Sequence, residues 1–215
     1  MMTIRFENIV PAPLEGVVSP KTEIWQKDIR FTPSQSYQVY SPSGKGKSSF
    51  LHIIYGLRKD FSGRLWLDDK NANHLQADEW AKLRQEIFSI VFQDLRLFLH
   101  LTAWENLLVK ASLYPQNKEK ELQEQAEFLG VAHVLHKPAA TLSYGERQRI
   151  AIIRALIQPF RWLLLDEPFS HLDQENISKA SQLISQKVAE NNAAVLMTSL
   201  GYEYELKFEE KKCLG

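Results

Sequence analysis

One short segment constrains the fold of this chain more than any other, because it joins a β-prone stretch to a helix through a glycine-containing loop. The loop consists of Ser41, Pro42, Ser43, Gly44, Lys45, Gly46, Lys47, Ser48 and Ser49. It follows the β-prone residues 37–40 and precedes an apolar, helix-like stretch that ends at Gly56. The spacing fits the phosphate-binding pattern GxxxxGK[ST], with Ser41 in place of the first glycine.

The chemistry of phosphate binding explains the residue types in this loop. Gly44 and Gly46 let backbone amides close around phosphate oxygens, and the N-terminus of the following helix favours negative charge. Lys47 supplies a point charge for the β and γ phosphates of a nucleotide, and Ser48 supplies a hydroxyl ligand for Mg²⁺. Ser41 has to accept a backbone shape that glycine adopts freely, so we expect slightly strained geometry there. Taken alone, the segment is also compatible with a surface turn.

A second segment places two acidic residues directly after an apolar strand. Residues 161–165 form this predicted strand, Asp166 and Glu167 follow it, and Pro168 stops it. Open α/β sheets bind ligands at the carboxyl ends of their strands, so both carboxylates are candidates for a catalytic site. Asp166 is placed to hold Mg²⁺ through water and Glu167 to polarise an attacking water. The alternative is an acid pair that caps a helix.

A third segment lies between the other two and opens an apolar, helix-like run. It consists of Leu142, Ser143, Tyr144, Gly145 and Glu146. In this order the three segments resemble the Walker A, signature and Walker B motifs of the ATP-binding subunits of ABC transporters, and the resemblance covers nearly the whole chain. Residues 94–107 are similar to the branch that contains lipoprotein-release, macrolide-export and cell-division ATPases. Their apolar side chains are interpreted as subdomain core, as a groove for a membrane partner, or as both.

Two further motifs extend the resemblance. Gln93 matches the Q-loop glutamine, which in the family touches Mg²⁺ and senses the transmembrane partner. The D-loop is matched by Ser170, His171, Leu172 and Asp173. The resemblance implies catalytic roles for Lys47, Gln93 and Glu167. It implies metal ligation by Ser48, Gln93 and Asp166.

The resemblance also implies partners and cofactors. In the family, the residues that match Ser143 and Gly145 reach the γ-phosphate of the opposing protomer, so two chains sandwich two ATP molecules about a two-fold axis. We therefore expect a homodimer, or a heterodimer with another ABC ATPase, that uses ATP and Mg²⁺. A transmembrane permease supplied by another chain would hold this one at the inner face of the cell membrane, on the cytoplasmic side.

The expected fold is α/β: a P-loop NTPase with a RecA-like mixed sheet core, a small antiparallel β subdomain and an inserted helical subdomain. Residues 1–215 form a single ABC ATPase domain, with the core at about 1–93 and 155–215 and the helical subdomain at about 94–154. Strands are predicted near residues 4–6, 23–31, 38–40, 64–67, 87–92, 161–165 and 193–198. Helices are predicted after Ser49 and near residues 102–114, 118–129, 143–156 and 174–191.

Composition agrees with this class. A chain of 215 residues with 44% hydrophobic and 24% charged residues suits one compact α/β domain. A formal net charge of zero gives no sign of a nucleic-acid partner, and none is expected. The single cysteine, Cys213, cannot form an internal disulfide, which favours a reducing cytoplasm. We expect no N-terminal signal, no membrane-spanning run and no regulatory domain beyond the short tail at 202–215.

Two departures from the family pattern lie on the nucleotide side. Ser199 follows the strand at 193–198, where the family usually places a histidine that contacts the γ-phosphate, so we expect slow turnover. No aromatic residue occurs between Phe6 and Trp25, where the family places its adenine-stacking residue. We therefore expect a weaker preference for ATP over GTP than is usual in the family, with Trp25 packed in the antiparallel subdomain rather than on the base.

Three functions are compatible with these residues. The first is Mg²⁺-dependent ATP hydrolysis that powers a membrane permease, which intact Lys47, Asp166 and Glu167 favour. The second is a nucleotide-gated, dimerising interaction module with little turnover, coupled to a membrane partner without transport, which Ser199 and Ser41 favour. The third, a soluble ABC protein that acts on ribosomes or DNA, is disfavoured because such proteins usually carry tandem domains or large insertions.

Overall fold

The chain folds around two sheets, and the computed structural model describes residues 2–114 and 118–215. The larger sheet has five strands in the order β6-β7-β8-β3-β9. Its members are β3 (Tyr37–Tyr40), β6 (Phe88–Val91), β7 (Trp162–Asp166), β8 (Ala194–Ser199) and β9 (Glu210–Cys213). Every neighbouring pair is parallel, so all five strands present their carboxyl ends at one edge.

The smaller sheet is antiparallel and has four strands in the order β2-β1-β4-β5. Its members are β1 (Ile4–Pro11), β2 (Asp28–Phe31), β4 (Phe61–Leu67) and β5 (Lys70–Asn71). Among the described residues, the expected mixture of parallel and antiparallel pairing is therefore divided between two sheets. The α/β fold class and the small antiparallel unit are confirmed.

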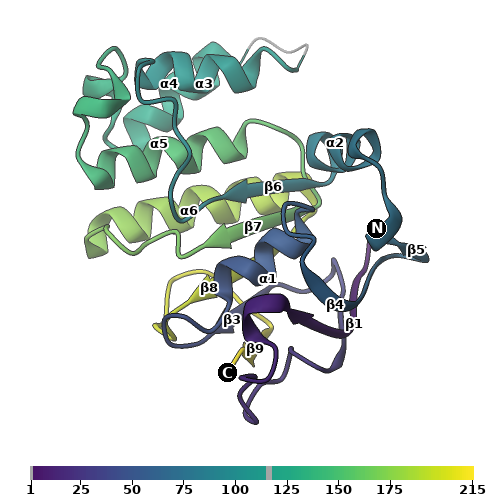
Figure 1. Ribbon diagram of the computed structural model, residues 1–215. Helices are drawn as coiled ribbons and strands as arrows, with labels where there is room; N and C mark the ends of the chain where they lie inside the picture. The colour runs from purple at the N-terminus through teal and green to yellow at the C-terminus, as the bar shows by residue number, and fades with distance from the viewer. Residues whose placement is uncertain (1, 115–117) are drawn as a thin grey trace.

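The helices lie around these sheets. They are α1 (Lys47–Ile54), α2 (Ala77–Glu86), α3 (Ala103–Ala111), α4 (Glu119–Phe128), α5 (Tyr144–Leu156) and α6 (Gln174–Asn191). Short 3₁₀ turns occur at η1 (Ala12–Leu14), η2 (Ala72–His74), η3 (Ala132–Val134) and η4 (Ala139–Thr141). Figure 1 shows α3, α4 and α5 gathered at one end of the molecule and the antiparallel strands at the other, with the parallel sheet between them.

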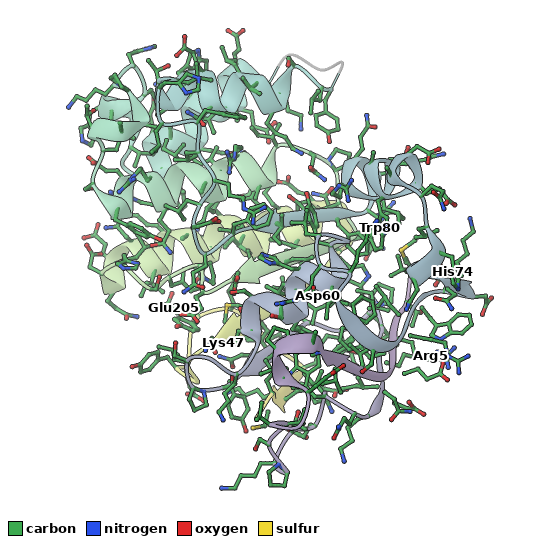
Figure 2. The ribbon with its side chains drawn as sticks, in the orientation of Figure 1. Arg5, Lys47, Asp60, His74, Trp80 and Glu205 are labelled. Atoms are coloured by element: carbon green, nitrogen blue, oxygen red, sulfur yellow. The ribbon has the colours of Figure 1, made fainter. Side chains whose placement is uncertain are left out.

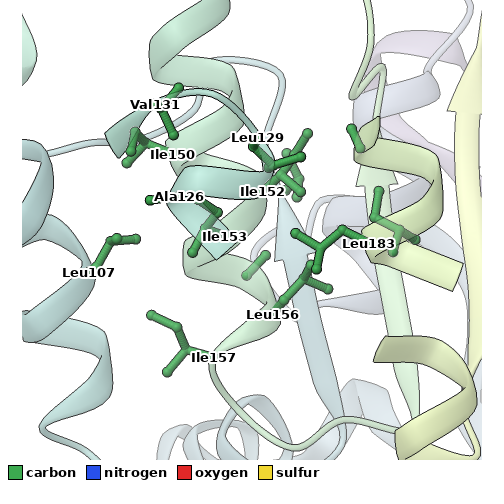
Figure 3. Packing of buried hydrophobic residues seen from close by; sticks show 14 of the residues in the cluster. Leu107, Ala126, Leu129, Val131, Ile150, Ile152, Ile153, Leu156, Ile157 and Leu183 are labelled. Carbon is green, nitrogen blue, oxygen red and sulfur yellow. The ribbon is translucent and has the colours of Figure 1, made fainter. Parts of the chain in front are cut away.

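Two clusters of buried apolar side chains hold the layers together. One lies between the antiparallel sheet, α1 and one face of the parallel sheet, and it includes Trp25, Phe50 and Trp162. The other joins α3, α4 and α5 to α6 and the opposite face of the sheet. In Figure 3, α5 side chains lie between Leu107 of α3 and Leu183 of α6. Because the second cluster runs from the helical layer into the sheet, the subdomain boundaries at 94–154 stay a prediction.

The main differences from the predicted elements have local causes. Only Asp28–Phe31 of the predicted strand at 23–31 is a strand. The preceding stretch is turned because the Thr22 hydroxyl accepts hydrogen bonds from the amides of Ile24 and Trp25, which sends both side chains into the core. Helix α1 begins at Lys47, inside the loop rather than after Ser49.

Among the helices and strands, sequence reasoning missed α2, β9 and the short strand β5. Helix α2 has Trp80 as its buried residue, which leaves no apolar stripe to detect. Its start was readable, because the Glu79 carboxylate accepts a hydrogen bond from the Gln76 amide at 3.0 Å. Strand β9 has a polar sequence because it is an edge strand that pairs with β3 alone.

Within residues 2–114 and 118–215, no helix is both long enough and apolar enough to cross a bilayer.

Candidate functional site

The phosphate loop connects the carboxyl end of β3 to the first turn of α1, as predicted. Gly44 and Gly46 have φ angles of 79° and 92°, in the left-handed region that glycine enters without strain. Ser41 is not among the described residues with positive φ, so the expectation of strain at Ser41 is wrong. Its amide instead donates to the carbonyl of Ser199, which continues the parallel pairing of β3 with β8 into the loop.

A buried support lies beneath the loop. A Cβ atom at Gly46 would come within 2.8 Å of Leu14 Cδ1 and 3.2 Å of Trp25 Cζ2, so this position has no room for a larger residue. Trp25 Nε1 also donates to the Lys45 carbonyl at 3.3 Å. Trp25 is 1% exposed and packs on Phe6 and Phe50, which confirms that it is a core residue. The weaker base preference stays a prediction.

Lys47 lies at the centre of the site, at the start of α1 (Figure 2). Its Nζ donates to the carbonyls of Ser41 and Pro42 at 2.8 and 3.0 Å. The same ammonium lies 3.4 Å from Glu167 Oε1, and both side chains are largely buried. The lysine therefore joins the phosphate loop to the acidic end of β7, with its charge shared between two carbonyls and one carboxylate.

Asp166 and Glu167 lie at the carboxyl end of β7, where β8 runs beside them. Asp166 is 1% exposed, and its Oδ1 accepts a hydrogen bond from Thr198 Oγ1 at 2.7 Å. Asp166 Oδ2 has no hydrogen-bond partner among the described residues. A buried, unpaired carboxylate oxygen is costly unless a cation or water completes it. The acid pair does not cap a helix, because α6 is capped by Asp173.

Glu167 adopts an unusual backbone conformation. Its φ is 48°, a region that non-glycine residues enter at a cost. The conformation is held from two sides: the Glu167 amide donates to the Thr198 carbonyl at 3.2 Å, and Gln148 Nε2 donates to the Glu167 carbonyl at 3.4 Å. This strain at a single acidic residue beside Lys47 marks Glu167 as a candidate catalytic group.

The oxygens needed for a divalent cation are present. Ser48 Oγ donates to Gln93 Oε1 at 3.3 Å, so the predicted hydroxyl and amide ligands meet. Hydroxyl, amide and carboxylate oxygens are the ligands that Mg²⁺ prefers, and Asp166 Oδ2 is the unpaired one. Burial lowers the pKa of the nearby His52, and this effect is larger than the opposite effect of the Asp166 charge. The imidazole is therefore neutral at pH 7 and adds no positive charge to the site. These residues fit Mg²⁺.

The third segment forms the start of α5. Ser143 is the N-cap, and its hydroxyl accepts from the Glu146 amide at 3.3 Å while Glu146 Oε2 accepts from the Ser143 amide at 2.8 Å. This pairing with Ser143 lowers the pKa of Glu146, so the carboxylate stays charged and favours the helix N-terminus. The predicted placement of this segment at a helix N-terminus is confirmed.

The chain matches the family described as ABC transporter over residues 26–170, which is more than half of its length. The chain belongs to the ABC transporter ATP-binding family. The phosphate loop, the third segment and the acid pair described above are therefore called the Walker A loop, the signature and Walker B from here on.

Individual relatives agree with this assignment. The lipoprotein-releasing system ATP-binding protein LolD of Buchnera aphidicola is 33% identical over 176 residues, which cover 80% of this chain and 75% of LolD. The glucose import ATP-binding protein GlcV of Saccharolobus solfataricus is also 33% identical, over 179 residues and 80% of this chain. The chain spans about half of the length of GlcV, 49%. The similarity to LolD agrees with the branch predicted from residues 94–107.

A solved structure supports the fold and the nucleotide site. The dimeric ATP-binding cassette MJ0796, in a post-hydrolysis state bound to ADP and Pi, superposes with a TM-score of 0.74 and 27% identity. The match covers 91% of this chain and 87% of MJ0796. Nucleotide binding by this chain follows from its membership of the family, and dimeric cassettes are among its structural neighbours.

The D-loop of this ABC chain lies against the signature helix. Its four residues connect the Walker B strand to α6, and Asp173 caps α6 by accepting from the Asn176 amide at 2.8 Å. This hydrogen bond lowers the pKa of Asp173. Ser170 Oγ lies 2.9 Å from His171 Nδ1, and the His171 ring lies 4.0 Å from that of Tyr144.

The H-loop position is buried and already hydrogen-bonded. Ser199 is 1% exposed, and its Oγ accepts from Gln38 Nε2 at 3.0 Å and from the Gly201 amide at 3.1 Å. Sequence reasoning missed two contributors to the site, Thr198 and Gln148, which hold Asp166 and Glu167 in place. Thr198 carried a readable signal, because it is the last residue of the strand predicted at 193–198. Gln148 carried none without the helix packing.

The unpaired oxygen of Asp166 generates a prediction. Asp166→Asn replaces the buried carboxylate with a neutral amide of the same size, so the expected Mg²⁺ site would lose its one charged ligand. We expect the gain in affinity for a non-hydrolysable ATP analogue on adding Mg²⁺ to fall by about tenfold or more, as measured by calorimetry. Binding without Mg²⁺ should be retained. Asp78→Asn on α2 is the matched control, and an unchanged Mg²⁺ effect in Asp166→Asn would contradict the assignment.

Proposed function

We propose that this chain is an ABC ATPase subunit that binds MgATP at the Walker A loop, hydrolyses it with Glu167 as general base, and powers a membrane permease supplied by another chain. One observation carries the proposal: Lys47 Nζ bonds to the Walker A carbonyls while lying 3.4 Å from Glu167 Oε1. The proposed phosphate-binding group, Lys47, is thus in direct contact with the proposed water-activating group, Glu167. Mg²⁺, when bound, neutralises charge on the phosphate oxygens.

This contact suggests how the nucleotide prepares the site. Phosphate oxygens compete with the Ser41 and Pro42 carbonyls and with Glu167 for the Lys47 ammonium, because they carry more negative charge. Once Lys47 turns to the phosphates, the Glu167 carboxylate is free to accept a proton from the attacking water. The backbone of Glu167 does not need to move, because Thr198 and Gln148 hold it.

Hydrolysis requires a dimer in this proposal. Within one chain, the Ser143 hydroxyl is bonded to Glu146 of its own helix, and the signature lies against the D-loop. A second copy, or another ABC ATPase, supplies the signature to each Walker A loop. The dimeric MJ0796 neighbour, bound to ADP and Pi, supports this arrangement.

The test is steady-state ATP hydrolysis with Mg²⁺ over a range of protein concentrations. We expect the rate to rise more than linearly with concentration, because the active form is a dimer. Glu167→Gln should lower the rate by about a hundredfold or more, because it removes the base and retains the shape. A linear dependence, or activity that survives in Glu167→Gln, would contradict the proposal. Nucleotide binding with negligible turnover would favour the gated interaction module, the second candidate.

The geometry of Ser199 supports slow turnover. Its hydroxyl is occupied by two donors, Gln38 Nε2 and the Gly201 amide, and it offers no imidazole to a phosphate. A site that lacks one donor to the developing charge of the transition state loses about 2 to 4 kcal/mol of stabilisation. This observation is also the one that favours the gated module.

Ser199→His tests this part of the proposal. We expect the single-turnover hydrolysis rate to rise by about a hundredfold, because an imidazole gains access to the γ-phosphate. Ser199→Asn provides similar bulk without a basic ring and should give no such gain. The melting temperature of each variant is measured, and hydrolysis rates are compared only between variants that keep the melting temperature of the parent. A correctly folded Ser199→His that hydrolyses no faster than the parent would count against the role of this position.

A groove beside the Q-loop is the proposed docking site for the permease. It encloses about 250 Å³ between α3, α5 and the segment that follows β6. Phe98, Val109 and Leu113 on its rim are 48%, 46% and 60% exposed. Contiguous apolar side chains that remain exposed mark surfaces for a protein partner.

The charge of this groove indicates what it binds. Three cations line it, Arg96, Lys110 and Arg154, and no carboxylate does among the described residues. Burial lowers the pKa of Lys110, and the nearby Arg154 charge lowers it further. A carboxylate from a partner would relieve this unfavourable pair of charges. We therefore propose that the groove takes an amphipathic cytoplasmic helix of the permease that carries at least one acidic residue.

Two synthetic helical peptides with the same leucine face test the charge preference, one with glutamates and one with lysines on its polar face. We expect the glutamate peptide to bind about tenfold more tightly by fluorescence anisotropy, because it pairs with Lys110 and Arg154. Lys110→Glu should reverse that preference. Lys82→Glu, on the distant helix α2, is the control. Equal binding of both peptides would contradict the proposed partner.

A further inference from the structure

The side chain of Tyr144 connects the signature helix to both loops that flank the nucleotide site. Its hydroxyl donates to the main-chain carbonyl of Gln93 in the Q-loop at 2.7 Å. Its ring lies 4.0 Å from the ring of His171 in the D-loop, and the Arg147 guanidinium lies 5.4 Å from it. A glycine at this position could make none of these contacts, because it has neither a ring nor a hydroxyl.

The backbone of the first turn of α5 lies close to the backbone of the D-loop. A Cβ atom at Gly145 would lie 3.2 Å from the His171 carbonyl, so the first turn of α5 packs tightly on the D-loop. Tyr144 is the first residue of α5 and is half-buried, with its ring against that of His171 and its hydroxyl on the Gln93 carbonyl. The packing of α5 on the D-loop therefore determines where the Tyr144 side chain lies.

The Q-loop itself is held in a strained turn. Leu95 and Arg96 have φ angles of 60° and 48°, in the left-handed region that non-glycine residues enter at a cost. Arg154, near the other end of α5, donates to the carbonyls of both residues at 2.5 and 2.7 Å. Helix α5 therefore contacts the Q-loop at two places: Tyr144 bonds to Gln93 before the turn, and Arg154 bonds to the turn itself.

We propose that Tyr144 is a positioning residue, which sets the place of Gln93 from the signature helix and so keeps the Gln93 amide beside Ser48 for the metal. This inference rests on the proposed Mg²⁺ site and adds to it a residue that touches neither metal nor nucleotide. The link runs from Tyr144 Oη to the Gln93 carbonyl and from Gln93 Oε1 to Ser48 Oγ at 3.3 Å. A change in the tilt of α5 therefore moves a metal ligand.

The test measures two quantities on the full chain, neither of which needs hydrolysis. The first is the Mg²⁺ concentration at the midpoint of its effect on binding of a non-hydrolysable ATP analogue. The second is hydrogen exchange at the Leu95 and Arg96 amides without nucleotide. Tyr144→Phe keeps the ring and removes the hydrogen bond. We expect the midpoint to rise by about three- to tenfold and both amides to exchange faster, with the melting temperature retained.

Tyr114→Phe is the matched control, because the Tyr114 hydroxyl also donates to a main-chain carbonyl, that of Gln85, at 3.1 Å. It should change neither quantity. In a Gln93→Ala background, Tyr144→Phe should no longer shift the midpoint, because the residue through which it acts is absent. An unchanged midpoint in Tyr144→Phe, or an equal shift in the Gln93→Ala background, would overturn the inference. A parent protein without any Mg²⁺ effect would instead refute the metal site on which the inference rests.

Discussion

The parallel pairing of β3, β8 and β7 is the constraint on which the rest of the site depends. Because the three strands run in the same direction, the loops that leave them meet at one edge of the sheet. This pairing places Ser41 beside Ser199, and Asp166 beside Thr198. Lys47 then needs only to fold back from α1 to reach both the loop carbonyls and Glu167. The proposed catalytic groups come from distant parts of the sequence, and the parallel pairing of the strands brings them together.

Helix α5 connects that edge of the sheet to the helical layer through its side-chain contacts. Its apolar face packs between α3 and α6, and its polar side chains reach the Walker B backbone through Gln148 and the Q-loop through Tyr144 and Arg154. The groove proposed to receive the permease lies beside the same Q-loop segment and is lined in part by Arg96 and Arg154. A partner that pushes on the groove and a nucleotide that binds at the sheet edge thus act on one short turn. This arrangement connects the two proposed binding events without a long pathway.

The motifs could be placed from the sequence because their chemistry is local. The glycines of the phosphate loop, the apolar strand before Asp166 and the capping box of Ser143 and Glu146 each fix a short stretch of backbone without help from distant residues. Elements without a local signature were missed or misplaced. Strand β9 pairs only with β3, so its own sequence does not predict it. Residues 23–27 resemble a strand in sequence because Ile24 and Trp25 enter the core, but they do so from a turn held by Thr22.

The sequence by itself determined the fold class, the order of the motifs and the family, because residue spacing within each motif is set by the local geometry of strand, loop and helix. Tertiary structure alone decided the roles that depend on contacts across the chain. Ser41 lacks the expected strain because the carbonyl of Ser199 pairs with its amide. Tyr144 contacts both the Q-loop and the D-loop because α5 packs against the D-loop. Such contacts join residues far apart in sequence, and only the packing of the layers brings them within hydrogen-bond distance.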